Sequence, residues 1–168
     1  MNKLSSKVEL TANLLIIVVA VVFGVVLAQK FFFYSANKQV QIQPTIGMKV
    51  NLPDVNWSKQ PKTLILALRS DCRFCNESAP FYQRLLAEAK AENVKLIAVF
   101  PTAVEESAAH LNELGLRGIE VRRSPLNNLQ AGATPTLILT DDKGAVTDFW
   151  VGKLPPDKED EVINKLNF

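Results

Sequence analysis

The sequence contains few of the side chains that metal and nucleotide sites need. It has two cysteines and one histidine, His110, among 168 residues. A structural zinc site needs four ligands, and this supply of Cys and His is too small. No glycine-rich fingerprint of a flavin or nicotinamide site is present. We therefore predict no cofactor and no bound metal.

The sequence also lacks a concentration of charge of either sign. Nineteen Lys and Arg residues stand against seventeen Asp and Glu residues, which gives a net charge of +2. A nucleic-acid site is expected to show a basic stripe, often with aromatic residues. Here the two signs are interspersed, so we predict no nucleic-acid partner.

One long stretch has no charged residue. The run from Leu10 to Gln29 covers about 30 Å as a helix, the thickness of a hydrocarbon core. An aromatic cluster at 31–34 would lie at the interface. The chain then divides into four parts: a short N-terminal segment (1–9), a transmembrane anchor (10–34), a polar tether (35–46) and one domain (47–168).

A cleavable signal peptide is the alternative interpretation of this stretch. Val26-Leu27-Ala28 resembles a small-x-small cleavage site. Signal h-regions usually run about 7 to 15 residues, and this one is longer, which favours an uncleaved signal-anchor. The short basic N-terminus favours an N-inside orientation. The domain would then lie on the exported (periplasmic or extracytoplasmic) side, and cleavage stays open.

Both cysteines lie in one motif, Cys72-Arg73-Phe74-Cys75. The motif follows an apolar run, 63–68, and precedes a segment with helical spacing, so a strand ends and a helix begins there. Free N–H groups and the dipole at a helix N-terminus stabilise a thiolate, so we expect a lowered pKa for Cys72 and assign it as the nucleophile. Cys75 can then attack a mixed disulfide on Cys72. This predicts a redox-active disulfide.

The rest of the domain alternates between apolar runs and helical spacing, which predicts an α/β fold with parallel strands joined by right-handed crossovers. A turn at 141–144 predicts an antiparallel hairpin, and Pro80 should kink the helix after the cysteines. The predicted strands are 63–68, 94–100, 119–122, 136–139 and 146–151, and the predicted helices run from the cysteines to about 92, over 104–114 and from about 155 to the end.

These features together resemble the thioredoxin family, most of all its membrane-anchored TlpA-like members. The likeness covers 47–168 and depends on the C-x-x-C pair, Pro80, Thr134-Pro135 and Gly152. It implies a thioredoxin-like fold, a central mixed sheet flanked by helices. It also implies that Pro135 is cis and faces the two sulfurs, and that the residue before it pairs with a bound substrate chain.

The resemblance implies a membrane-tethered thiol–disulfide oxidoreductase that reduces or exchanges disulfides of exported proteins. The chain has no third cysteine, so it needs a separate membrane or soluble thiol electron donor. We expect the reducing direction from the resemblance, and oxidase or isomerase activity stays open. The predicted catalytic residues are Cys72, Cys75 and Pro135, and the predicted substrate-binding residues are Thr134, Arg73 and Phe74.

The sequence departs from the family near the cysteines. Many thioredoxins carry a buried acid six residues before the first cysteine, where this chain has Leu66. Deprotonation of Cys75 would then need Asp71, Glu77 or water. Arg73 should favour the thiolate of the first cysteine and Asp71 should oppose it, so the two partly offset.

Two other functions could use the same cysteines. A copper chaperone would present Cys72 and Cys75 to Cu(I), with His110 as a possible third ligand. Otherwise we expect His110 to be solvated on its helix. A peroxiredoxin-like peroxidase is the second alternative. Its reactive cysteine follows a proline at seven positions and a Thr or Ser at three, where this chain has Ile65 and Arg69.

Overall fold

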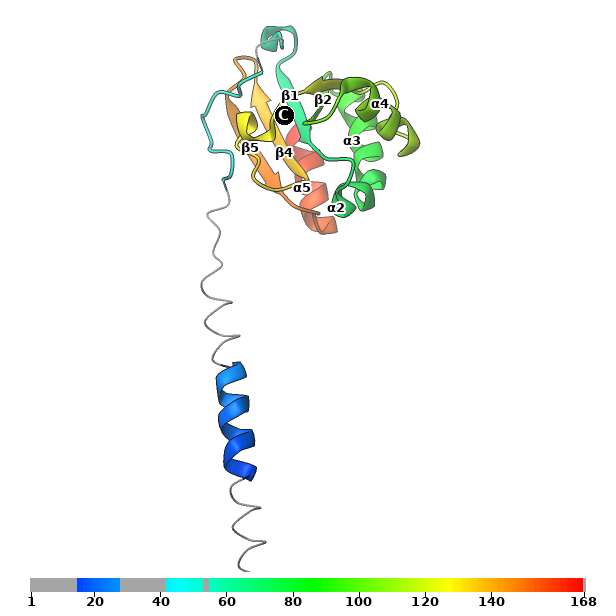
Figure 1. Ribbon diagram of the computed structural model, residues 1–168. Helices are drawn as coiled ribbons and strands as arrows, with labels where there is room; N and C mark the ends of the chain where they lie inside the picture. The colour runs from blue at the N-terminus through cyan, green and yellow to red at the C-terminus, as the bar shows by residue number, and fades with distance from the viewer. Residues whose placement is uncertain (1–14, 28–41, 53–54, 168) are drawn as a thin grey trace, which may run out of the picture. The chain divides into compact units, whose positions relative to one another are not determined.

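The computed structural model describes residues 15–27, 42–52 and 55–167 (Figure 1). The chain separates into two units, one ending at residue 40 and one beginning at residue 41. In the first unit, residues 15–27 form a helix in which every residue is apolar and exposed. Within the described ranges, no helix combines the length and hydropathy that a membrane span requires. The other residues of the predicted anchor lie outside these ranges.

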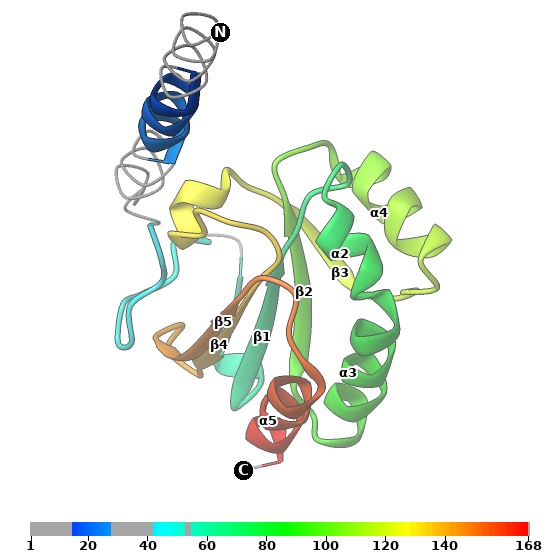
Figure 2. The same ribbon diagram turned by 90° about the horizontal axis from the view of Figure 1, so that it is seen from below.

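Five strands of the second unit form a mixed sheet in the order β3-β2-β1-β4-β5 (Figure 2). β1 pairs in parallel with β2, and β2 with β3, whereas β4 runs antiparallel to both β1 and β5. The predicted parallel strands and C-terminal hairpin are therefore confirmed. The strands are β1 (Lys62–Ala67), β2 (Lys95–Phe100), β3 (Glu120–Arg123), β4 (Thr136–Asp141) and β5 (Val146–Val151).

Each of the three inner strands contains a continuous apolar run because both of their faces are covered. In β1, Leu64 and Leu66 face one buried cluster, while Ile65 and Ala67 face another. Successive side chains of a strand point to opposite faces of the sheet. A strand with a core on each face therefore needs apolar residues at odd and even positions alike. This explains why the sequence shows continuous apolar runs at the inner strands.

Helices cover one face of the sheet, and irregular segments cover the other (Figure 2). The first cluster takes side chains from the four helices of the domain. The second takes them from the segment 48–57 and the short 3₁₀ helix η2 (Leu126–Leu129). The helices are α2 (Arg73–Glu77), α3 (Ala79–Ala91), α4 (Val104–Glu113) and α5 (Pro156–Leu166).

The helix after the cysteines is divided in two, where the sequence predicted one kinked helix. α2 ends at Glu77, Ser78 follows as a cap, and α3 begins at Ala79. Pro80 therefore lies in the first turn of α3, where a residue without an N–H loses no helical hydrogen bond. The separation leaves the cysteines on a helix of only five residues.

Candidate active site

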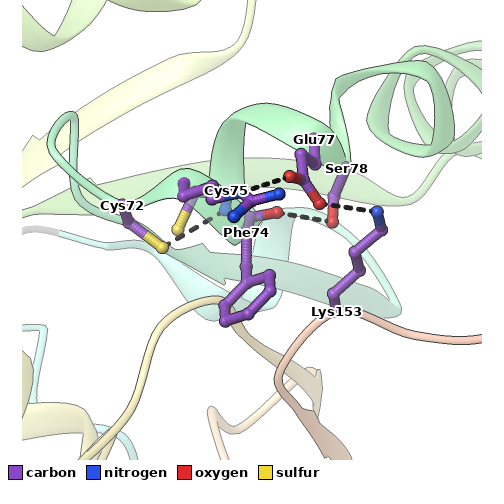
Figure 3. Close-up of polar contacts among 7 residues, drawn as sticks. Cys72, Phe74, Cys75, Glu77, Ser78 and Lys153 are labelled. Atoms are coloured by element: carbon purple, nitrogen blue, oxygen red, sulfur yellow. Dashed lines mark hydrogen bonds and ion pairs between the residues drawn. The ribbon is translucent and has the colours of Figure 1, made fainter.

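The cysteines lie just beyond the carboxyl end of the central strand β1. Cys72 is the N-cap of α2, and its Sγ accepts a hydrogen bond from the backbone N–H of Cys75 at 3.2 Å (Figure 3). The sulfur thus occupies the place of a capping oxygen and satisfies a free N–H of the first turn. Both cysteines are free thiols in this structure. The predicted position between a strand and a helix is confirmed.

The two thiols differ in burial and acidity. Cys72 is half-buried, whereas Cys75 is 2% exposed. Burial opposes ionisation of Cys72, but hydrogen bonds involving Cys75 and Thr134 outweigh it, so the pKa of Cys72 is lowered as expected. Burial, and after it the hydrogen bond with Cys72, raises the pKa of Cys75 to about 12. An accessible thiol with a lowered pKa therefore stands beside a buried thiol with a raised pKa.

The loop before β4 faces Cys72. The Thr134-Pro135 peptide bond is cis, in agreement with the family resemblance. The Cys72 thiol donates to the carbonyl oxygen of Thr134 at 3.4 Å. Thr134 is half-buried and Pro135 is buried. Cys72 and Thr134, which are 62 positions apart in the sequence, are thus in contact through the sulfur of Cys72.

Two hydrogen bonds hold this loop in place. The N–H of Gly152 donates to the carbonyl of Pro135 at 2.7 Å. Gly152 has a φ of +86°, a backbone conformation that glycine adopts without strain. The buried hydroxyl of Thr136 donates to the carbonyl of Ala133, also at 2.7 Å. The loop is therefore attached to β5 on one side and to β4 on the other.

The carboxylates nearest to the cysteines are engaged in ion pairs. The guanidinium of Arg69 donates to both oxygens of Asp71, at 2.9 and 2.8 Å. Glu77 accepts from Arg73 at 2.6 Å and from Lys153 at 2.8 Å (Figure 3). These cations lower the pKa of each carboxyl group and so make both carboxylates weaker bases.

This pairing argues against Asp71 and Glu77 as the base for Cys75 and leaves water among the three alternatives. Both carboxylates are exposed, whereas Cys75 is buried. Leu66, at the place of the family's acid, is also buried in the core. The guanidinium of Arg73 is highly exposed and paired with Glu77, which it shares with Lys153.

No protein-family model and none of the curated proteins compared with the chain matches it. Solved structures do match. A protein from Chlorobium tepidum assigned as thiol:disulfide interchange protein DsbE is 21% identical over 74% of this chain and 99% of its own, with a TM-score of 0.59. The domain has the thioredoxin-like fold.

Two further structures support this fold. A thiol-disulfide isomerase from Corynebacterium glutamicum is 15% identical, with a TM-score of 0.54 over 75% of this chain and 94% of its own. StoA from Bacillus subtilis is 15% identical, with a TM-score of 0.52 over 71% of this chain and 93% of its own. The fold class predicted for the domain is confirmed.

His110 contacts α2, the helix that carries Cys75, which corrects the expectation that it is merely solvated. It is half-buried on α4, with its Nε2 at 3.0 Å from Oδ1 of Asn76 on α2. Its ring also lies edge-on to Phe100, with 6.4 Å between the ring centroids. His110 therefore links α4 to the helix that carries the cysteines.

The geometry does not provide the ligand set of a copper chaperone. Among residues 15–27, 42–52 and 55–167, no three His, Cys, Asp or Glu side chains are grouped closely enough to hold a metal ion. His110, the third ligand in that alternative, is instead bonded to Asn76. The peroxidase alternative gains no support either, because Ile65 is buried within β1 and Arg69 is paired with Asp71.

Two buried polar residues behind the cysteines have no signal in the sequence. The hydroxyl of Ser78 donates to the carbonyl of Phe74 at 2.8 Å. Tyr82, in the first turn of α3, is 0% exposed, and its hydroxyl has no hydrogen-bond partner among the described residues. An aromatic residue on the apolar face of a helix is ordinarily a core residue, so only the structure distinguishes Tyr82 from its neighbours.

Proposed function

We propose that this protein is a thiol–disulfide oxidoreductase that reduces or exchanges disulfides in exported proteins while tethered to a membrane. The observation that carries the proposal is the pair of unlike thiols. The Sγ of Cys72 lies between the N–H of Cys75 and the carbonyl of Thr134, and only Cys72 is accessible. Interchange and isomerase proteins with the same fold support this assignment.

The reaction follows from this asymmetry. The Cys72 thiolate attacks a client disulfide, and one client sulfur leaves with the bonding electron pair. Cys75 then loses its proton and attacks Sγ of Cys72, which releases the second client sulfur as a thiolate. The client gains two electrons and, from solvent, two protons. The enzyme is left with a Cys72–Cys75 disulfide, which a separate thiol donor must reduce.

Three residues around Cys72 are suited to hold the client. The backbone of Thr134 lies next to the nucleophilic sulfur, where an extended client segment can pair with it. The side chain of Phe74 is 53% exposed and offers an apolar contact beside the nucleophile. Arg73 is also highly exposed and adds a polar contact on the same turn.

The reducing direction is the one that the charges favour. Strongly oxidising dithiols have a reduced form that is strongly stabilised. Here both arginines near Cys72 are held in exposed ion pairs, Arg69 with Asp71 and Arg73 with Glu77, and a paired cation stabilises a thiolate less than an unpaired one. We expect a reduction potential near or below about −250 mV from equilibration with glutathione. A value near the roughly −120 mV of strong oxidants would reverse the assigned direction.

The proposed anchor, residues 10–34, is supported by two observations. The uncharged run is long enough to cross a hydrocarbon core as a helix. Its described part, 15–27, is helical and apolar on every side, which is typical of helices buried in protein or lipid. We expect the full chain to resist alkaline extraction from membranes and the domain to be protease-accessible only from the exported side. Release of the chain by alkali would contradict the anchor.

Trapping tests the reaction itself. In Cys75→Ser the nucleophile remains and the resolving thiol is lost, so client proteins should accumulate as mixed disulfides that dithiothreitol releases. The matched control is Cys75→Ser combined with Cys72→Ser, which should form no adduct. No adduct in the single variant, together with no reduction of a model disulfide such as insulin by the wild type, would refute the proposal.

A further inference from the structure

The segment that leads into the domain contacts the loop before β4, residues 131–135. Ile42 is the first described residue of this segment and belongs to the second unit. The N–H of Gly132 donates to the carbonyl of Ile42 at 2.9 Å. Gly132 is two residues before Thr134, whose carbonyl faces Cys72. A part of the chain outside the sheet is therefore bonded to the loop next to the nucleophile.

Gly132 is a glycine because another backbone approaches it closely. It does not have a positive φ, so the backbone conformation does not require a glycine. A Cβ at this position would lie 2.6 Å from the oxygen and 3.1 Å from the nitrogen of Ile42. Both are backbone atoms, which cannot rotate away as the end of a flexible side chain can. The absence of a side chain thus makes room for the segment at Ile42.

The segment that contains Ile42 is itself attached to the domain. Pro44 is buried. The N–H of Gly47 donates to the carbonyl of Val146 at 2.7 Å, and the N–H of Val146 donates to the carbonyl of Met48 at 2.9 Å. Figure 2 shows the segment, in cyan, beginning beside η2, in yellow. Because the segment is fixed to β5, the carbonyl of Ile42 can serve as a support for Gly132.

The contact adds a third attachment to this part of the loop. Ala131 is buried, and its N–H donates to the carbonyl of Leu126 in η2 at 3.1 Å. The carbonyl of Ala133 accepts from the first residue of β4. Gly132 lies between these two residues, is exposed, and is attached through Ile42. The three residues before Thr134 are therefore bonded to three different parts of the domain.

We propose that the contact between Ile42 and Gly132 positions Thr134 for pairing with a client. This inference rests on the proposed function. A client segment can pair with the backbone of Thr134 only while the polar groups of that backbone keep their direction. Gly132 touches neither the client nor the sulfur, so it is a positioning residue that acts through Thr134. Client recognition would then depend on a segment that lies outside the sheet.

The attack of Cys72 on a small disulfide depends much less on this contact. The hydrogen bond from the N–H of Cys75 to the sulfur comes from α2 and does not involve the loop. If a shift of Thr134 changes the pKa of Cys72, the effects on thiolate fraction and on nucleophilicity partly cancel. A small disulfide therefore reports on the nucleophile, whereas a protein disulfide also reports on the loop.

The test compares Gly132→Ala with the wild type as full chains in detergent. The protein substrate is insulin with dithiothreitol as electron donor, and the small disulfide is dithiobis(nitrobenzoate). We expect kcat/KM for insulin to fall at least about threefold, mainly through KM, as for the loss of one backbone hydrogen bond. The rate constant for the first nitrothiobenzoate released should stay within about twofold of the wild type.

The matched control is Gly144→Ala. Its Cβ would meet the ring of Trp57 at 2.7 Å, in the turn at the opposite end of β4 from Thr134. This variant should also be less stable to heat, but it should react with both disulfides at the wild-type rates. The control therefore separates a loss of stability from a loss of positioning.

Two further measurements test whether the contact exists in solution. In a free loop, Gly132→Ala would be neutral or stabilising, because alanine restricts the unfolded chain; with Ile42 in place, the melting temperature should fall. The amide of Gly132 should also exchange slowly with deuterated water in the wild type, although the residue is exposed.

Several results would overturn the role of this contact. They are a freely exchanging Gly132 amide in the wild type, an unchanged or raised melting temperature of Gly132→Ala, a fall in kcat/KM for insulin of less than threefold, and equal slowing with both disulfides. A wild type that reduces no insulin would instead overturn the proposed function, and this inference with it.

Discussion

The unlike acidity of the two thiols predicts selective alkylation of the reduced protein. With a pKa of about 12, about one Cys75 side chain in 10⁵ is ionised at pH 7, compared with about 1% of a thiol whose pKa is 9.0. The pKa of Cys72 is lowered from that value, so its ionised fraction is larger. Because the thiolate is the reactive species, Cys72 should be alkylated at least about a thousandfold faster than Cys75.

The sequence makes this ratio simple to measure. Arg69 and Arg73 flank a tryptic peptide that contains Cys72, and the next tryptic peptide contains Cys75. A brief pulse of iodoacetamide on the full reduced chain, followed by unfolding and labelling with a heavy form of the reagent, gives both rates by mass spectrometry. In guanidinium chloride the rates should converge. Rates within a hundredfold of each other in the folded protein would refute the inferred protection of Cys75.

Two further predictions concern stability. Thr136→Val removes the hydroxyl that satisfies the carbonyl of Ala133, and should lower the free energy of unfolding in urea by about 1 to 3 kcal/mol; no loss would mean that the carbonyl finds another donor. Gly144→Ala should destabilise more than Gly118→Ala. Both glycines have positive φ, but only at Gly144 would a Cβ meet a ring, at 2.7 Å from Trp57. Equal melting temperatures would show that the Trp57 ring moves aside.

Patterns within a few residues sufficed to predict the fold and the position of the cysteines. Continuous apolar runs indicated β1, β2 and β4, because strands covered on both faces need them. The C-x-x-C motif and Thr134-Pro135 are also local signals. The residues alone do not show that these two segments are in contact. Only the resemblance to a family implied that Thr134 lies next to Cys72.

Two of the corrections depend on contacts between distant residues. Glu77 was considered as a base because it is near Cys75 in the sequence, but Lys153, 76 positions away, holds it at the surface. His110 was expected to be solvated because its neighbours in the sequence are polar, yet its partner Asn76 is 34 positions away. No periodicity or propensity encodes such pairs.

The separation of α2 from α3 has a consequence for how the protein responds to oxidation. Forming the disulfide brings the two sulfurs to about 2.05 Å. Pro80 has no N–H to continue the hydrogen-bond ladder, and Ser78 caps both helices, so a shift in the five residues of α2 need not pass into α3. The oxidised and reduced proteins would then differ in one small surface patch on an unchanged scaffold. Under the proposed function, a client and an electron donor would each recognise the protein by that patch.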